Sequence, residues 1–207
     1  MALQTREQHI KREKATSNIC TAQALLANMA VMYTIYHGPK GLKKIAQRIH
    51  SLAQSVEAQL TSLGITQSNK YYFDTLHFSG FDVIALQKEA LASHINFRYF
   101  NDGINDNSIC ISIDETTTIN EISKLVKLFE KVTGKKASNK NAAAASIPAS
   151  LVRSSTYLQH PVFNSHHSET QMMRYIKQLQ NKDLSLNTSM ISLGSCTMKL
   201  NAATEMI

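Results

Sequence analysis

The residues that are scarce in this sequence exclude several classes of protein. Among its 207 residues there are 3 Cys, 3 Pro, 7 Gly and no Trp. Cys20, Cys110 and Cys196 lie far apart, and no group of Cys and His has the spacing of a zinc site. We therefore expect three reduced thiols rather than a disulfide scaffold. The glycine-rich phosphate-binding motifs and the GxSxG motif of many hydrolases are also missing.

Long apolar runs and targeting features are absent as well. No apolar stretch approaches the roughly 20 residues that a membrane-spanning helix needs. The N-terminal stretch MALQTREQHIKREK is polar and contains two Glu, which is untypical of a signal or transit peptide. A soluble cytoplasmic protein is the expectation.

The charges that are present give a basic but foldable chain. Lys and Arg number 22 against 15 Asp and Glu, for a net charge of +7. With 43% hydrophobic and 18% charged residues, the composition is that of a folded domain rather than a disordered chain. Near the N-terminus, two Glu interrupt a basic stretch made of Arg6, Lys11, Arg12 and Lys14. This stretch fits a solvated helix face, or a contact to phosphate or nucleic acid, although no aromatic residues are interleaved with it.

Hydrophobic periodicity predicts two long helices at the start of the chain. Apolar residues recur at helical spacing over 19–36, after the candidate caps Thr16, Ser17 and Asn18. Gly38 should end the first helix and Pro39 should begin the second. The second apolar stripe runs over 42–63 and is closed by Gly64. We expect these helices to form a hairpin, with Met29 and Met32 as core residues.

The pattern then shortens to that of a mixed α and β segment. Residues 71–76, 95–100 and 108–113 are typical of strands, and Asn101-Asp102-Gly103 indicates a hairpin loop between the last two. A helix is predicted over 81–93, and Thr118 with Glu121 forms a capping box for a helix to about residue 132. The fold class is therefore α+β, with an antiparallel sheet of about three strands covered by helices. The inward face predicted for the helix over 81–93 consists of Val83, Ile84, Leu86, Ala90 and Leu91.

A change in composition divides the chain. Residues 134–150 are small, polar and basic, which indicates a linker between residues 1–133 and 151–207. The four alanines at 142–145 could instead extend a helix. Beyond the linker, Ser168 and Gln171 predict a second capping box, for a helix through about Gln180. Its predicted apolar face consists of Met172, Met173, Ile176 and Leu179.

Two short polar segments are candidates for ligand binding. Residues 14–20 place hydroxyl and amide side chains at a predicted helix N-terminus, where free N–H groups suit a phosphate or carboxylate. Residues 194–199 combine small polar residues with Lys199 between apolar neighbours. Helix caps have the same composition, so the residues alone leave both interpretations open. His160, His166 and His167 have no carboxylate at chelating spacing, and we expect them to be surface or hydrogen-bonding residues.

These segments resemble the glycine cleavage P-protein family, whose members are glycine dehydrogenases (decarboxylating). The resemblance is carried by residues 1–27, by FDTL at 73–76, by DETTT at 114–118 and by HPVFNSHHSETQMMRY at 160–175. The run NKDLSLNTSMISLGSCTMKLNA, at 181–202, is the most specific match. Together the motifs span nearly the whole chain and are weakest across residues 134–150.

The resemblance implies a pyridoxal-phosphate enzyme of the aminotransferase-like type I fold, built from two homologous halves. Residues 1–133 resemble the end of the N-terminal half, including its small C-terminal subdomain, and residues 151–207 resemble the start of the catalytic C-terminal half. Met1-Ala-Leu3 resembles an internal stretch of the family, and the family chain continues past Ile207. We therefore expect a partial gene, a split copy or a truncated chain.

The implied reaction decarboxylates glycine with pyridoxal 5'-phosphate and passes the aminomethyl group to the lipoyl arm of the H-protein. The implied partners are the H-protein and the remainder of the P-protein or a second P-protein subunit; neither nucleic acid nor a membrane is implied. The net charge of +7 would favour encounter with an acidic carrier protein. The alternatives are a basic module that binds nucleic acid and a structural subunit without catalysis.

The resemblance also implies which residues lie near the active-site cavity. They are Thr16, Ser17, Asn18, Cys20, Ser195, Cys196, Thr197, Met198 and Lys199. The family's Schiff-base Lys follows a His further downstream, and neither Lys14 nor Lys199 matches that motif. The glycine-rich stretch that seats the cofactor phosphate is missing as well. No catalytic residue is therefore assigned, and inactivity of the chain alone is expected. His166 departs from the Tyr expected at its position, whereas His167 fits the pattern.

Overall fold

The computed structural model describes residues 21–100, 107–138 and 147–182. The chain forms two compact units. One, here called the core unit, is His37–Gln159; the other, the helical unit, combines Met1–Tyr36 with His160–Ile207. These units are groups of residues that lie together in space. They do not test the domain boundaries predicted from the sequence at residues 133 and 151, which remain predictions.

Helix α1, Thr21–Ser62, is interrupted at Gly38 as the sequence predicts. Gly38 has φ 62° and ψ 178°, a conformation that is essentially confined to glycine, and Pro39 begins the second stretch. The helix ends before Gly64, which has φ 87°, and the Gly64 N–H donates to the Thr61 carbonyl. The predicted caps of the first stretch lie outside the described residues. The hairpin of the two stretches stays a prediction.

The sheet has four antiparallel strands in the order β1-β2-β4-β3. The strands are β1 Thr66–Gln67, β2 Thr75–Ser79, β3 Arg98–Phe100 and β4 Ser108–Ser112. The expected number was three, because β1 is only two residues long and carries no alternating pattern. The predicted antiparallel pairing of β3 with β4 is confirmed, with Tyr99 opposite Ile109. The loop at 101–106 lies outside the described residues.

The strand predicted over 71–76 is shifted in the structure to 75–79. Tyr71 and Phe73 are exposed and Tyr72 is only half-buried, so none of these three aromatic side chains is fully buried in the core. In β2, Leu76 and Phe78 point into the core while their neighbours face outward. Alternation between core and solvent therefore marks the true strand, and aromatic content alone misplaced it.

Helices α2, Val83–Ala92, and α3, Ile119–Thr133, confirm the two helices predicted in this part of the chain. Asp82 caps α2 by accepting from the Ala85 N–H. Thr118 and Glu121 make the predicted capping box in both directions, and Gly134 closes α3 in the left-handed region. The predicted inward face of α2 is wrong at Ile84 and Leu91, which are exposed. Because α2 covers the core with a narrow stripe, only Val83, Leu86 and Ala90 are buried.

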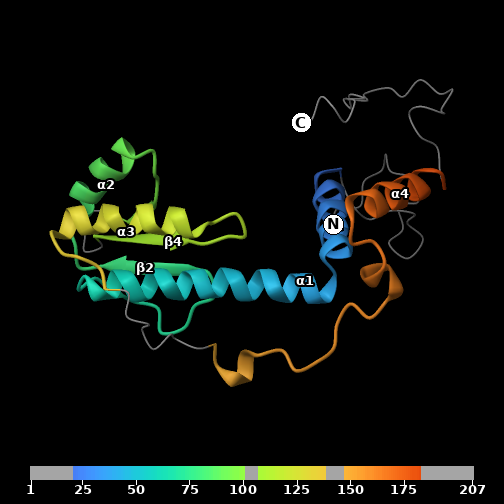
Figure 1. Cartoon of the computed structure of the whole chain (residues 1–207), viewed down its shortest axis with the longest axis horizontal. Coiled ribbons are helices and arrows are strands. Elements are labelled where there is room, and N and C mark those ends of the chain that lie inside the picture. Colours follow the sequence, from blue (N-terminus) through green and yellow to red (C-terminus); the bar gives the residue numbers. More distant parts are fainter. Residues whose placement is uncertain (1–20, 101–106, 139–146, 183–207) are drawn as a thin grey trace, which may run out of the picture. The chain divides into compact units, whose positions relative to one another are not determined.

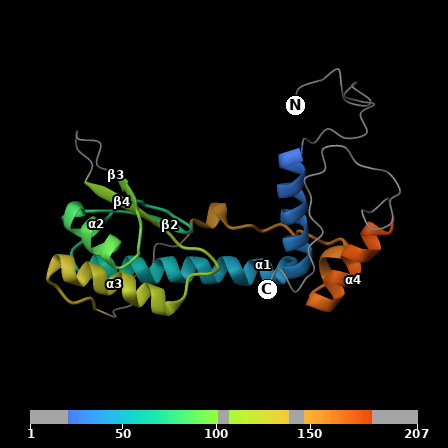
Figure 2. The same cartoon turned by 90° about the horizontal axis from the view of Figure 1, so that it is seen from above.

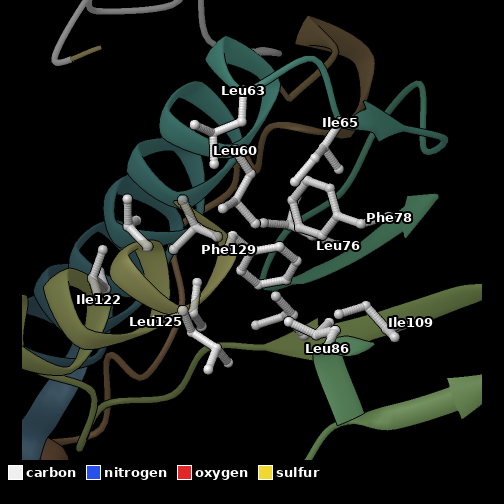
Figure 3. Close-up of a cluster of buried hydrophobic side chains, with 14 of the residues drawn as sticks. Leu60, Leu63, Ile65, Leu76, Phe78, Leu86, Ile109, Ile122, Leu125 and Phe129 are labelled. Atoms are coloured by element: carbon white, nitrogen blue, oxygen red, sulfur yellow. The ribbon is translucent and has the colours of Figure 1, made fainter. Parts of the chain in front are cut away.

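One hydrophobic core fills the core unit (Figure 3). Leu60 of α1, Leu86 of α2 and Phe129 of α3 are fully buried against Phe78 and Ile109 of the sheet. The second stretch of α1 and helix α3 lie along the same side of the sheet (Figure 2). The core unit is thus a sheet layer packed on a helix layer, as the α+β prediction requires.

The chain after α3 begins anchored to the core unit. The Ser138 N–H donates to Ser62 Oγ, and Lys135 Nζ donates to the Leu63 carbonyl. Residues 139–146, which include all four alanines of 142–145, lie outside the described residues. Short 3₁₀ turns follow at Ala149–Leu151 and Pro161–Asn164.

Helix α4, Glu169–Gln180, confirms the helix predicted from its cap at Ser168 (Figure 1). The capping box is only half made, because the Gln171 side chain accepts from the His167 N–H instead of reaching the cap. The predicted apolar face buries Met172 but leaves Met173 and Ile176 exposed. No helix in the described part of the chain combines the length and hydropathy needed to cross a bilayer.

Candidate functional site

The nine residues that the resemblance places near the active-site cavity lie outside the described residues. They are Thr16, Ser17, Asn18, Cys20, Ser195, Cys196, Thr197, Met198 and Lys199. Their proximity to one another therefore stays a prediction. The described residues do contain three of the matching motifs, at 73–76, 114–118 and 160–175.

Two of these motifs meet at one end of the sheet, here called the motif corner. FDTL, at 73–76, leads into β2, and DETTT, at 114–118, leaves β4. Thr75 of β2 pairs with Ser112 of β4 in the antiparallel register, so both motifs lie at the same end of these two strands. The Ile113 N–H donates to the Asp74 carbonyl at 3.1 Å and extends the pairing by one step.

Asp114 organises the turn that carries DETTT. Its Oδ1 accepts from the side chains and backbone N–H groups of Thr116 and Thr117, at 2.8–3.0 Å. The hydroxyl groups of these two threonines are the main reason that the pKa of the Asp114 carboxyl is lowered from its ordinary value. The carboxylate thus fixes the short connection between β4 and the capping box of α3.

Arg48 and His50, on the second stretch of α1, hold the motif corner against the helix. Arg48 donates through Nη1 to the Glu115 carbonyl at 2.8 Å and through Nη2 to the Thr117 carbonyl at 2.7 Å. His50 Nδ1 lies 2.8 Å from the Phe73 carbonyl, which can only accept, so Nδ1 carries the proton. The His50 ring also stacks on the Phe73 ring, with an angle of 5° between the planes.

Sequence reasoning missed Arg48 and His50. Both sit between the apolar residues Ile45, Ile49 and Leu52, within a stripe that was interpreted as core. Both side chains contact residues that are distant in the sequence. The separations are 67 and 69 residues for Arg48 and 23 residues for His50. The available signal was the interruption of an apolar helix face by two basic side chains with a polar turn downstream.

Tyr72 adds a half-buried polar contact next to the motif corner. Its hydroxyl donates to Glu57 Oε2 at 2.6 Å. Burial, followed by the hydrogen bond to Glu57, raises the pKa of the Tyr72 phenol well above its usual range. These pairings engage the polar groups of the motif corner with one another and tie α1 to the sheet.

The third motif, residues 160–175, lies in the helical unit. His160 Nδ1 accepts from the Val162 N–H and caps the turn that follows. The His166 ring stacks on Tyr175 at 4.2 Å between centroids, and His167 Nδ1 lies 2.8 Å from the Tyr36 carbonyl. The prediction of surface or hydrogen-bonding residues is confirmed for His160 and His167, which are exposed, whereas His166 is half-buried. No group of three His, Cys, Asp or Glu in the described residues could hold a metal ion.

The described residues do not fit the role of anchoring pyridoxal 5'-phosphate. Desolvation in an enclosed site is one means by which the amine of a Schiff-base Lys is activated. Every Lys in the described part of the chain is exposed. Several bond to other groups: Lys131 with Glu89, Lys136 with Glu130, and Lys135 with the Leu63 carbonyl. The predicted donors at 16–20 and 195–199 suit a phosphate or carboxylate but match no Schiff-base motif.

Comparison with known proteins identifies the family. The sequence profile described as glycine cleavage system P-protein matches residues 1–129. Proteins named glycine dehydrogenase (decarboxylating) match the whole chain, at 56% identity in Shewanella halifaxensis and 53% in Flavobacterium johnsoniae. The chain spans 22% of the length of each of these relatives.

A crystal structure of glycine decarboxylase (P-protein) in inhibitor-bound form is also similar. The alignment has a TM-score of 0.49 and 26% identity, and it covers 63% of this chain and 31% of that chain. The match of the family profile to more than half of the chain agrees with the resemblance of its motifs. The chain belongs to the glycine cleavage system P-protein family.

Proposed function

We propose that the chain contributes to glycine decarboxylation as part of a glycine dehydrogenase (decarboxylating). The observation that supports this most directly is 56% identity to a relative of that name, extending over all 207 residues. Both predicted site segments, 16–20 and 195–199, fall within the aligned region. Because the chain spans only 22% of that relative, the activity belongs to an assembly that contains the rest of the protein.

In this proposal the chain supplies polar residues near the cavity and another polypeptide region supplies the Schiff-base Lys. Thr16, Ser17 and Thr197 would donate hydroxyl hydrogen bonds to a phosphate or to the substrate carboxylate, and Lys199 would add positive charge. Pyridoxal 5'-phosphate, when bound, supplies the electron sink for the carbanion that remains after CO2 is lost. The substrate is glycine, and the acceptor is the lipoyl group of the H-protein.

A chimera tests this proposal. The 207 residues replace the matching segment of the Shewanella halifaxensis relative, and glycine–CO2 exchange is measured with H-protein present. We expect exchange within tenfold of the parent relative, and none from the isolated 207-residue chain. Thr197→Val in the chimera should raise the KM for glycine or weaken cofactor binding, whereas Thr156→Val, in the exposed segment 153–156, is the matched control.

Two results would contradict the proposal. One is a folded chimera that binds pyridoxal 5'-phosphate but has no exchange activity. The other is stoichiometric, borohydride-fixed cofactor on one Lys of the isolated chain.

The alternative of a nucleic-acid-binding module gains no support from the family membership. It predicts binding that weakens steeply as salt increases, because phosphate contacts release counterions. Titration of the chain with duplex DNA at two salt concentrations distinguishes the two functions. The other alternative is a structural subunit without catalysis. It becomes equivalent to the proposal if the remaining parts of the enzyme are supplied as separate chains.

A further inference from the structure

The break in α1 brings a carbonyl group of its first stretch to a histidine from the other end of the chain. Gly38 interrupts the helix, so the Tyr36 carbonyl belongs to the last turn of the first stretch, where carbonyls lack a partner within the helix. His167 Nδ1 lies 2.8 Å from this oxygen, at a sequence separation of 131 residues. Because a carbonyl can only accept, Nδ1 carries the proton. Tyr36 and His167 both belong to the helical unit.

His167 is itself fixed to the start of α4. Its backbone N–H donates to Gln171 Oε1 at 3.2 Å, and the neighbouring Ser168 hydroxyl accepts from the Gln171 N–H as the cap of the helix. The ring that precedes it, His166, stacks on Tyr175 one turn further along α4. The imidazole of His167 therefore joins the end of one helix to the beginning of another.

The buried part of the first stretch of α1 lies next to this contact. Ile35 is 2% exposed, whereas Leu25 is 62% and Met29 is 59% exposed. The other buried hydrophobic residue in the described part of the helical unit is Met172, which lies on α4. Burial along the first stretch is thus concentrated at the end that His167 binds.

A helix that is held at one end moves most at the other. The predicted donors Thr16 and Ser17 precede this helix in the sequence. At about 1.5 Å per residue, Thr21 lies about 23 Å from Tyr36 along the helix axis. A tilt of about 5° at Tyr36 therefore moves Thr21 by about 2 Å. Donors in a binding site have to stay within roughly 0.5 Å of their productive positions.

We propose that His167 is a positioning residue for glycine decarboxylation. Its Nδ1–H binds the Tyr36 carbonyl and so sets the direction of the helix that leads to the predicted site segment 16–20. The inference rests on the proposed function, because the role of that segment does. His167 is exposed, so water can replace the hydrogen bond that the Tyr36 carbonyl would lose. Water does not tie the carbonyl to α4, so direction is lost while stability is largely kept.

Three variants separate this role from that of an ordinary surface histidine. His167→Phe keeps a ring but removes the donor. His167→Asn keeps a side-chain N–H donor close to the position of Nδ1. His166→Phe is the matched control, because it makes the same replacement one residue earlier and keeps a ring that can stack on Tyr175. All three are made both in the 207-residue chain and in the chimera.

The distance between the two helices provides a measurement that does not depend on activity. Leu25 and Met173, which are both exposed, are replaced by p-acetylphenylalanine, which carries a spin label and leaves the cysteines unchanged. Double electron–electron resonance then gives the label distances in the 207-residue chain. We expect one narrow distribution in the parent, in His167→Asn and in His166→Phe. In His167→Phe it should broaden or shift by at least about 2 Å.

Two results of this measurement would overturn the proposal. One is the same distribution in His167→Phe as in the parent, and the other is a broad distribution in the parent itself. Thermal unfolding of the 207-residue chain is the check on stability. Because the hydrogen bond is exposed, the midpoint of His167→Phe should fall by no more than about 3 °C.

Glycine–CO2 exchange in the chimera tests the consequence for the reaction. We expect kcat/KM for glycine to be at least fivefold lower in His167→Phe, because displaced donors cost rate even when the fold is intact. His167→Asn and His166→Phe should stay within twofold of the parent. Exchange by His167→Phe within twofold of an active parent, or a loss that His167→Asn does not restore, would refute the inference alone. A parent chimera without exchange would refute the proposed function, and the label distances would then decide whether His167 sets the direction of α1.

Discussion

Truncating Phe129 should destabilise the core unit more than any surface change on the same helix. Phe129 is fully buried, and its ring packs edge-to-face on Phe81 at 5.4 Å and beside Phe97 at 6.1 Å between centroids. Loss of a buried Phe side chain typically costs about 3–5 kcal/mol. Each lost aromatic pair accounts for about 0.5–1.5 kcal/mol beyond the buried area. We therefore expect Phe129→Ala to lie near the upper end of the range.

Urea denaturation followed by circular dichroism measures this loss. With a slope of about 1.5 kcal/mol per molar urea, a loss of about 5 kcal/mol lowers the midpoint by about 3.3 M. Phe129→Leu, which keeps most of the volume, should lose only about 1–2 kcal/mol. Ile119→Ala is the control, because Ile119 lies on the same helix but is exposed, and it should stay within about 0.5 kcal/mol. A free energy of unfolding for Phe129→Ala within about 0.5 kcal/mol of that of the control would refute the placement of Phe129 in the core.

Two further predictions concern the motif corner. Arg48→Met removes the hydrogen bonds to the Glu115 and Thr117 carbonyls. If buried, each of these hydrogen bonds would contribute about 1.5–3 kcal/mol to the free energy of unfolding. Because Arg48 is exposed and water can replace its guanidinium, we expect a total loss of about 1–2 kcal/mol in the same urea assay. Arg153→Met is the control. A loss of stability in Arg48→Met no larger than in this control would contradict a stabilising role for the two Arg48 hydrogen bonds. The pKa of the Asp114 carboxyl is lowered in the folded state, so its stabilising contribution is present above the ordinary value of 3.8 and disappears as pH falls through the lower folded value. Thermal melts of Asp114→Asn should therefore lose less stability than the parent chain between pH 5 and pH 3, and identical pH profiles would show that the Asp114 turn does not stabilise the fold.

The elements with local signals could be predicted from the sequence. The break at Gly38-Pro39, the cap at Ser168 and the capping box of α3 depend on residues within a few positions of one another, and the structure confirms them. The β3–β4 hairpin was also predictable, because two apolar runs flank a short polar loop. Local chemistry is sufficient wherever a helix or hairpin begins or ends on its own residues.

The features that depend on distant contacts could not be predicted. The start of β2 is set by its pairing with β4, and β1 exists only because Thr66 and Gln67 pair with Ser79 and Phe78. The hydrogen bond from Arg48 to the Glu115 carbonyl joins residues that are more than sixty positions apart in the sequence. Exposure of Ile84 and Leu91 follows from the narrow contact that α2 makes with the core, which helical spacing does not reveal. For the candidate site, the family motifs indicated which residues to consider but not how they are arranged.

The glycine and proline in the middle of α1 also determine how that helix can form. A helix grows residue by residue from a costly first turn, and growth cannot pass through a residue held at φ 62° and a following residue without an N–H. The two stretches must therefore nucleate separately. The second stretch gains its stability from the core of its own unit, whereas the first must gain it from the residues that pack on it. Loss of structure on heating should consequently proceed in two stages, with residues 24–36 melting before the sheet.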